Sequence, residues 1–363
     1  MKWIRSAPFD LALIIGPALV AVALVLAIPA LRDPKTPPWG FLVFVIFVDV
    51  AHVWSSLYRT YFDPDEFKRR RAHYLATPLV CFLAGAALYY LGGHLLFWRV
   101  LAYLAVFHFV RQQMGFVMVY RHRAGERDHA WIDKLAIYAT MLYPLAYWHA
   151  TPNRSYDWFV TGDFIPSPPE LKWMGLGLYT AAIAIFVARQ AQIAAQGRSL
   201  NWPKIGIVVS TALTWYVGIV AFNSDFAFTI TNVVAHGVPY MALVWLYGRR
   251  KWSGTRSWLG WIHHPAAALI FVGIIFAIGY AEEGLWDRFI WHEHASLFFG
   301  LSAPRPMSEE ALTIIVPALV LPQATHYVLD AWIWKFDGSN PGLRYYLFLE
   351  GEKPPVADYN PSV

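Results

Sequence analysis

The sequence predicts an all-α, polytopic membrane helix bundle, and its composition, apolar runs and charge distribution each support that fold class. Of the 363 residues, 57% are hydrophobic and 15% are charged, whereas a soluble domain carries about 25% charged residues. Apolar runs recur along the chain, at roughly the 20 residues that an α-helix needs to cross a bilayer. The net charge is +5, but Lys and Arg lie mostly between these runs and form no single basic patch. Their positions therefore indicate membrane topology and no nucleic-acid partner.

We expect ten spans in one integral membrane domain, residues 1–363. The first span has a longer apolar stretch than a signal peptide and no clear cleavage site, so we expect the mature protein to keep it. Two longer links, 151–169 and 282–308, follow spans five and nine, and either could form a short surface helix or a lid. The expected spans are about 10–31, 39–58, 74–93, 95–121, 131–150, 170–192, 203–222, 225–248, 258–281 and 309–334.

Basic residues are concentrated in every second link and at both termini. The link after span two carries Lys68, Arg69 and Arg70, and Lys353 belongs to the same side, whereas Arg305 is one of few on the opposite side. The positive-inside rule therefore places both termini in the cytoplasm, in agreement with an even number of spans. The predicted location is the cytoplasmic (inner) membrane.

Four histidines lie within predicted spans and away from their ends, on spans two, four, eight and ten: His52, His108, His236 and His326. These spans run in one direction, and at about 1.5 Å per residue the four side chains lie roughly 10–20 Å from the cytoplasmic edge. Each histidine alone could be a hydrogen-bonded packing residue. Four at one depth favour a shared metal ion, because helix bundles build metal sites from facing helices and imidazole suits Fe, Zn or Cu.

Two carboxylates accompany these histidines at helical spacing. Asp49 precedes His52 by three residues, and Asp330 follows His326 by four. Metal-bound histidines usually donate their second N–H to a carboxylate or carbonyl, so both residues are candidates to orient the rings, with direct ligation as an alternative. A structural role is equally open: either carboxylate could pair with Arg111, or Asp330 could extend towards the cytoplasmic edge of the membrane.

Other polar residues lie at a similar depth, and each could orient a ligand or make an ordinary interhelical hydrogen bond. They are Tyr240, Gln112, Gln113, Asn232 and Gln323.

Other metal motifs are largely missing from the sequence. It has neither the HxxHH box of membrane desaturases nor the HExxH of zincins, and its adjacent pair His263-His264 is followed directly by a proline. The motif WHEH, with His292 and His294, falls in an outside link, where it either binds a metal at the surface or forms a solvated loop. Ligation of one or two b haems by pairs of histidines stays open.

Four patches resemble the histidine helices of the Brp/Blh family of membrane β-carotene 15,15'-dioxygenases. The segment FHFVRQQMGF resembles the family's HFG-type helix, and LVLPQATHYVLDAWIW resembles its closing helix, where an Asp follows a VPH segment. NVVAHGVPYMALVW and VDVAHVWSSLY fall, in order, where the family has its other histidine helices. The family pairs two histidines four residues apart, whereas this chain has Tyr240 four residues after His236, and it has more spans. The resemblance implies a histidine-only non-haem Fe(II) site that uses O2 to cleave a lipophilic polyene.

The residues alone predict an intramembrane metal site, and the resemblance selects iron and O2, which implies a non-haem iron oxygenase for a lipophilic, carotenoid- or lipid-like substrate. The four intramembrane histidines would ligate Fe(II), with Asp49, Asp330 and Tyr240 in catalytic roles beside them. O2 and membrane lipids are the other expected partners. Two alternatives stay open: a haem b electron-transfer subunit, and a proton-coupled transporter that uses the buried His and Asp residues.

Overall fold

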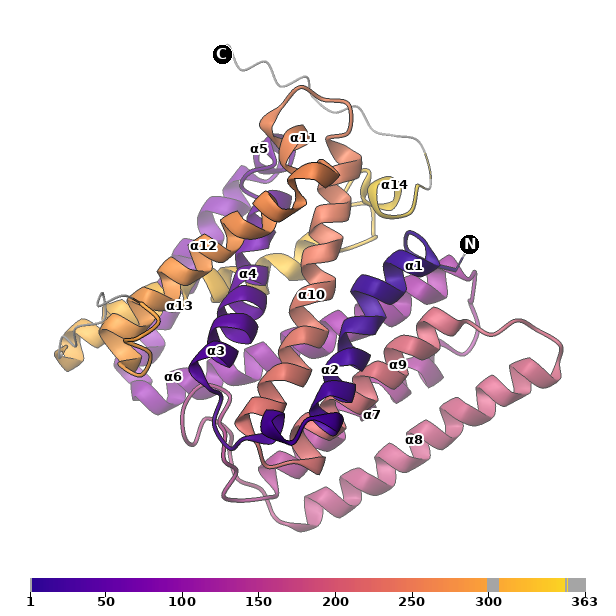
Figure 1. Ribbon diagram of the computed structural model, residues 1–363, viewed down its shortest axis with the longest axis horizontal. Coiled ribbons are helices and arrows are strands. Elements are labelled where there is room, and N and C mark those ends of the chain that lie inside the picture. Colours follow the sequence, from indigo (N-terminus) through magenta and orange to yellow (C-terminus); the bar gives the residue numbers. More distant parts are fainter. Residues whose placement is uncertain (1, 299–306, 350, 352–363) are drawn as a thin grey trace. The chain divides into compact units, whose positions relative to one another are not determined.

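The computed structural model (Figure 1) describes residues 2–298, 307–349 and 351. These residues form helices joined by turns, without a strand among them, so the all-α prediction is confirmed for the part of the chain that is described. Arg305, Lys353 and residues 299–306 of the second long link lie outside the described residues.

Eight of the described helices are long and apolar enough to cross a membrane, which indicates a multi-pass membrane protein. Large apolar side chains such as Leu79, Leu178 and Leu269 are exposed on them, as expected for faces that contact lipid. The eight are Ala7–Ala27, Pro38–Arg59, Arg71–Arg123, Glu170–Ala195, Trp202–Ala221, Asp225–Lys251, Pro265–Trp291 and Glu309–Ile333.

The helix α6 (Arg71–Arg123) contains two of the ten predicted spans. Its backbone leaves helical geometry at Gly93, where φ is 76° and ψ is 172°, a conformation that only glycine adopts readily. The helix α7 (Ala130–His149) coincides with the fifth predicted span but is not among the eight apolar helices. The count of ten spans therefore stays a prediction.

The ninth predicted span begins and ends later than expected. Residues Trp258–Ile262 form the separate short helix α11, and the spanning segment runs from Pro265 to Trp291. Proline disfavours helical geometry in the residue before it but suits the first helical position, so Pro265 ends one helix and begins the next. The predicted start at 258 is therefore too early, and the helical segment also continues past the predicted end at 281 to Trp291.

The chain divides into two compact units. Unit 1 comprises Met1–Pro37 and Trp98–Pro239, and unit 2 comprises Pro38–Phe97 and Tyr240–Val363. The helices α6 and α10 (Asp225–Lys251) each contribute a part to both units. A single integral membrane domain over residues 1–363 stays a prediction.

In unit 1, α7 packs against α8 and α9, and α2 packs against α9 (Figure 1). Asn201 caps the start of α9 by accepting a hydrogen bond from the backbone N–H of Lys204, and Ser6 caps α1 in the same way through Phe9. The elements of this unit are α1 (Ala7–Asp10), the π-helix η1 (Leu11–Ile15), α2 (Gly16–Ala27), η2 (Pro29–Arg32), α7, α8 (Glu170–Ala195), α9 (Trp202–Trp215) and the π-helix η5 (Tyr216–Ala221), with the parts of α6 and α10 named above.

A buried ion cluster joins α6, α7 and α9 in unit 1. The ammonium of Lys204 lies 2.6 Å from Glu126 Oε2 and 3.1 Å from Asp133 Oδ1. Arg121 forms an ion pair with the same Asp133 and lies 3.3 Å from Glu126. The Asn201 amide donates to Glu126 Oε1 at 2.9 Å. Two buried cations therefore depend on one fully buried carboxylate, Asp133, and one that is partly exposed.

In unit 2, α12 packs against η3 and α4, and α13 packs against α4 and α12. A side chain at Gly279 of α12 would lie 3.2 Å from Val50 Cγ1, so this glycine permits the close approach of α12 to η3. The elements of this unit are α3 (Pro38–Gly40), the π-helix η3 (Phe41–Val50), α4 (Ala51–Ser55), η4 (Ser56–Arg59), α5 (Pro64–Arg69), α11, η6 (Pro265–Ala267), α12 (Ala268–Trp286), the π-helix η7 (Asp287–Trp291), α13 (Glu309–Ile333) and α14 (Leu343–Phe348), with the remaining parts of α6 and α10.

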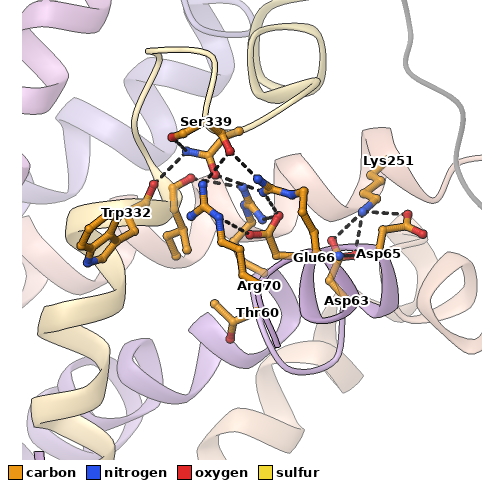
Figure 2. A network of polar contacts seen from close by, with 12 residues as sticks. Thr60, Asp63, Asp65, Glu66, Arg70, Lys251, Trp332 and Ser339 are labelled. Carbon is orange, nitrogen blue, oxygen red and sulfur yellow. Dashed lines mark hydrogen bonds and ion pairs between the residues drawn. The ribbon is translucent and has the colours of Figure 1, made fainter. Parts of the chain in front are cut away.

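Unit 2 has its own ion cluster, which Figure 2 shows around the start of α5. The ammonium of Lys251 lies 2.6 Å from Asp63 Oδ1 and 3.0 Å from Asp65 Oδ2. Arg59 lies 3.2 Å from Glu66 Oε2. Burial raises the pKa of Glu66, but Arg59 and Arg69 outweigh it and lower that pKa to about 2. The cluster connects α5 with the end of α10.

Candidate metal centre

In unit 2, α4 and α13 bring His52 and His326 into contact. Their ring centres are 5.0 Å apart with the planes at 78°, and both side chains are buried. The ring of Tyr240 on α10 lies 5.0 Å from the ring of His326 and 5.6 Å from that of His52. Three predicted site residues from distant parts of the sequence therefore form one cluster.

The segment before His52 is a π-helix over Phe41–Val50, and α-helical geometry returns at Ala51. π-Helical turns are rare and frequently occur at functional sites. A π-helix rotates less per residue than an α-helix, so the directions of Asp49 and of the residues before it differ from those that a regular α-helical span predicts. The sequence carries no clear signal for this feature, and it was not predicted.

Each predicted carboxylate lies beside the histidine of its own helix. The Tyr240 hydroxyl donates to Asp330 Oδ1 at 2.6 Å, and Asp330 Oδ2 lies 3.7 Å from His326 Nε2. Asp49 Oδ1 lies 3.5 Å from His52 Nδ1. Asp330 thus stands between a phenol and an imidazole, which is the position that a residue orienting the His326 ring would need.

In unit 1, α6 and α10 bring His108 and His236 into contact. Their ring centres are also 5.0 Å apart, with the planes at 82°, and both side chains are buried. The ring of Phe109 stacks on His236 with a centre distance of 3.7 Å and an angle of 12°. Phe109 is a contact that sequence analysis missed, because an aromatic residue beside a histidine is common in apolar helices.

Two glutamines fix the helices that carry this second pair. Pro239 lacks a backbone N–H, so the carbonyl of Ala235, four residues earlier, loses its helical donor. Gln113 supplies the missing donor, at 3.2 Å from that carbonyl, and in turn accepts a hydrogen bond from the hydroxyl of Thr211 at 3.2 Å. Gln112 donates to the backbone carbonyl of His236 at 2.9 Å. Both glutamines therefore make interhelical hydrogen bonds to the backbone of α10. Of the two roles expected for them, this is the structural one and not the orientation of a bound ligand.

Either histidine pair has a geometry that suits a common ion. With a metal–nitrogen bond of about 2.1 Å, two imidazoles on one ion place their ring centres roughly 4.5 to 6 Å apart. The 5.0 Å separation in each unit falls in this range, and the near-perpendicular planes allow both rings to present an edge to one point. The histidine groups of the chain could therefore bind metal.

The remaining candidate residues have other surroundings. The backbone N–H groups of Glu293 and His294 donate to Asp287 Oδ1 at 2.8 and 2.7 Å, so the WHEH motif forms a turn at the end of η7. Gln323 donates to the hydroxyl of Tyr327, and Asn232 to the carbonyl of Phe228, each within its own helix. These contacts give the motif and the two amides structural roles.

No family model, curated protein or solved structure matches the chain. The resemblance to the Brp/Blh family therefore stays a prediction. The helices and side chains define the class: a multi-pass, all-α membrane protein with two pairs of buried histidines.

Proposed function

We propose that the chain is an intramembrane non-haem iron oxygenase that acts on a lipophilic substrate, with His52, His108, His236 and His326 as iron ligands. The observation that carries the proposal is the pairing of these histidines within each unit. His52 and His326 are far apart in sequence, as are His108 and His236, and each pair is in ring contact. The sequence predicts that all four histidines lie at a similar depth in the membrane. We therefore propose that the four bind a single shared ion.

The pair geometry supports a small ion rather than a haem held within one pair. In a bis-histidine haem the two rings ligate the iron from opposite faces of a flat macrocycle. In unit 2 the ring of Tyr240 already packs against both histidines, and in unit 1 Phe109 stacks directly on His236. Rings that touch one another and a third aromatic ring leave no space for a macrocycle between them.

The residues around the histidines would serve iron chemistry in defined ways. The bound Fe(II) would supply the activation of O2. Asp330, held by the Tyr240 hydroxyl, keeps a carboxyl oxygen 3.7 Å from His326 Nε2 and would orient that ring once the two close to hydrogen-bond distance. Asp49 is placed to do the same for His52. Neutral imidazole ligands leave the ion with its full charge, which favours an anionic ligand in the remaining positions.

A proton-coupled transporter is the second candidate, and a specific contact favours it. Tyr240, Asp330 and His326 are neighbouring titratable groups within unit 2, at 2.6 and 3.7 Å from one to the next. Ionisable residues at this depth frequently mark proton relays in membrane transporters. This candidate requires no bound metal, so metal analysis separates it from the oxygenase.

Metal analysis combined with an optical spectrum of the detergent-purified protein tests the proposal. We expect about one iron per chain and no Soret band. A Soret band would instead select the haem subunit, and protein without metal after reconstitution with Fe(II) under anaerobic conditions would select the transporter.

Single substitutions in both pairs test the shared ion. We expect His52→Ala and His236→Ala each to remove most of the iron, because losing one ligand weakens the whole site. His122→Ala is the matched control, since His122 is exposed at the end of α6 and should leave the iron content unchanged. Iron that persists at half its content in each variant would contradict one shared ion, and equal retention in all three would contradict the ligand assignment.

A further inference from the structure

Unit 1 contains a tyrosine and a histidine joined by a hydrogen bond in which the histidine must accept. The ring of His149 contacts the backbone carbonyl of Leu145 through Nδ1 at 2.7 Å. A carbonyl can only accept, so Nδ1 carries the proton and Nε2 presents a lone pair. The Tyr103 hydroxyl lies 2.8 Å from that Nε2 and therefore donates to it. Tyr103 is thus placed to give its proton to His149.

The link between α7 and α8 covers this pair. The backbone N–H of Ile165 donates to the Tyr103 hydroxyl at 3.3 Å, and that of Ser167 donates to the His149 carbonyl at 2.8 Å. The ring of Phe164 stacks on His149 with a centre distance of 4.8 Å and lies 5.4 Å from Tyr103. The phenol oxygen therefore has a donor on one side and a proton acceptor on the other.

A continuous series of aromatic rings leads from this pair to His236. Phe164 lies 5.9 Å from Trp158, and Trp158 lies 5.4 Å from Phe109, measured between ring centres. Phe109 stacks on His236 at 3.7 Å. Every step is a ring contact within unit 1, and the two easily oxidised side chains of the series, Trp158 and Tyr103, are separated by a single phenylalanine ring.

We propose that Trp158 and the Tyr103–His149 pair form a redox relay that carries one oxidising equivalent from the His236 end of unit 1 to Tyr103. The oxidant is an oxidised transition-metal centre at the histidines, so the relay's place in a reaction rests on the proposed function. Its use would be to remove an oxidising equivalent from the centre when no substrate consumes it. The path itself depends only on the side chains of unit 1.

The relay consists of two balanced steps. In the first, Trp158 gives one electron to the oxidised centre and becomes a cation radical. In the second, Tyr103 gives one electron to Trp158 and transfers its hydroxyl proton to His149 Nε2. The O–H bond of Tyr103 breaks and an N–H bond forms, leaving a neutral tyrosyl radical, restored Trp158 and an imidazolium whose Nδ1–H still faces the Leu145 carbonyl.

A photosensitiser attached next to Trp158 tests the path without any metal. Cys81 is the single cysteine, so a Cys81→Ser background with Asp157→Cys offers one thiol for the label, at an exposed position adjacent to Trp158. A flash in the presence of an electron acceptor generates the oxidant. Electron paramagnetic resonance, with ring-deuterated tyrosine to assign the signal, measures the tyrosyl radical. We expect its yield to fall at least tenfold in Tyr103→Phe, in Trp158→Phe and in His149→Phe.

Tyr156→Phe is the matched control. The ring of Tyr156 lies 4.7 Å from Trp148 in the same aromatic cluster, but its hydroxyl is near the Ile219 carbonyl and accepts a hydrogen bond from the Arg154 guanidinium. Neither group takes up a proton, so we expect the radical yield to stay unchanged. An unchanged yield in Tyr103→Phe, or its loss in Tyr156→Phe, would overturn the relay.

The labelled protein also separates the relay from the proposed function. A tyrosyl radical at Tyr103 in protein that binds no iron would support the path while the oxygenase proposal fails. Iron binding with no radical at Tyr103 would leave the oxygenase proposal standing and overturn the relay. Near-ultraviolet circular dichroism of each variant confirms that the aromatic cluster keeps its packing, so that a lost radical reports the missing group.

Discussion

The two histidine pairs have the same ring separation but are positioned in different ways. In unit 2, His52 and His326 have carboxylates of their own helices beside them, and the Tyr240 ring touches both. In unit 1, a phenylalanine stacks on His236, and glutamines of α6 hold the backbone of α10. A buried imidazole can thus have either a carboxyl group or packing and backbone contacts beside it.

The ion clusters of the units differ in a similar manner. In unit 1, two cations, Arg121 and Lys204, share the two carboxylates Asp133 and Glu126, whereas in unit 2 Lys251 alone has two, Asp63 and Asp65. Removing one partner of a buried ion pair leaves an uncompensated charge, which costs about 3 to 5 kcal/mol. The cost depends on what remains beside the charge, so the two clusters should respond unequally.

The largest effect is expected for Asp133→Asn. Two buried cations would keep only the partly exposed carboxylate of Glu126 between them, and we expect a loss of about 3 to 5 kcal/mol in the free energy of unfolding. Asp63→Asn should cost less, about 1 to 2 kcal/mol, because Lys251 keeps Asp65 at 3.0 Å and an asparagine still caps α5. Denaturant unfolding in detergent, followed by tryptophan fluorescence, measures both. The exposed Asp128→Asn serves as the control, and equal losses in the two buried variants would contradict the comparison.

A pH effect of intermediate size is expected in unit 2. His263 is buried between Tyr58 and Phe271, and burial lowers its pKa from 6.5 to about 4. Between these values the unfolded chain binds the proton and the folded chain does not, so stability is full above about pH 6.5 and falls as the pH is lowered towards 4. The loss amounts to about 2 to 3 kcal/mol.

Hydrogen exchange at pH 7 and pH 5 measures this effect by region. We expect faster exchange at pH 5 in α11 and α12 of unit 2, after correction for the intrinsic rates, and little change in α7 of unit 1. His263→Gln removes the titrating group and should flatten the response. Glu66, with its pKa near 2, stays charged over this range and does not contribute. The same acid response in wild type and variant would assign it to other groups.

Metal affinity should respond to the carboxylate of unit 2 more than to the amide of unit 1. Asp330→Asn keeps the shape of the side chain but replaces the carboxyl group beside His326 with an amide, and loss of such a partner typically weakens metal binding about 10- to 100-fold. Gln112→Leu removes only a bond to the His236 backbone carbonyl, and we expect a change within threefold. Competition with a chelator of known affinity measures both values. A larger loss of metal affinity in Gln112→Leu than in Asp330→Asn would contradict this prediction.

The fold was predictable from the sequence because hydropathy reports burial in lipid directly. The described helices agree with the predicted spans to within a few residues except at the ninth, where proline moves the start to Pro265 and the helix continues to Trp291. The site was predictable in part. Helical spacing places Asp330 beside His326 on α13, whereas Asp49 reaches His52 from the end of a π-helix that the sequence did not predict.

Contacts between distant helices left no comparable signal. The stack of Phe109 on His236 and the donation from Gln113 to Ala235 depend on how α6 packs against α10, which no local spacing encodes. One clue was present: Pro239 inside an apolar helix requires an outside donor for the carbonyl four residues earlier, and Gln113 was one of few amides at that depth. Pairing such prolines with buried amides would have found this contact.

The smallest effect is expected for that glutamine. Gln113→Leu leaves the Ala235 carbonyl without its donor, and interhelical hydrogen bonds in membrane proteins contribute about 1 kcal/mol. Gln323→Leu in unit 2 is the matched control, because Gln323 donates to Tyr327 on its own helix and joins no two elements. We expect a loss of about 1 kcal/mol in the free energy of unfolding for Gln113→Leu and less than half of that for Gln323→Leu. Equal values would mean that a neighbouring donor replaces Gln113 at the kink, and the packing of α6 on α10 would then rest on the Gln112 hydrogen bond and on apolar contacts.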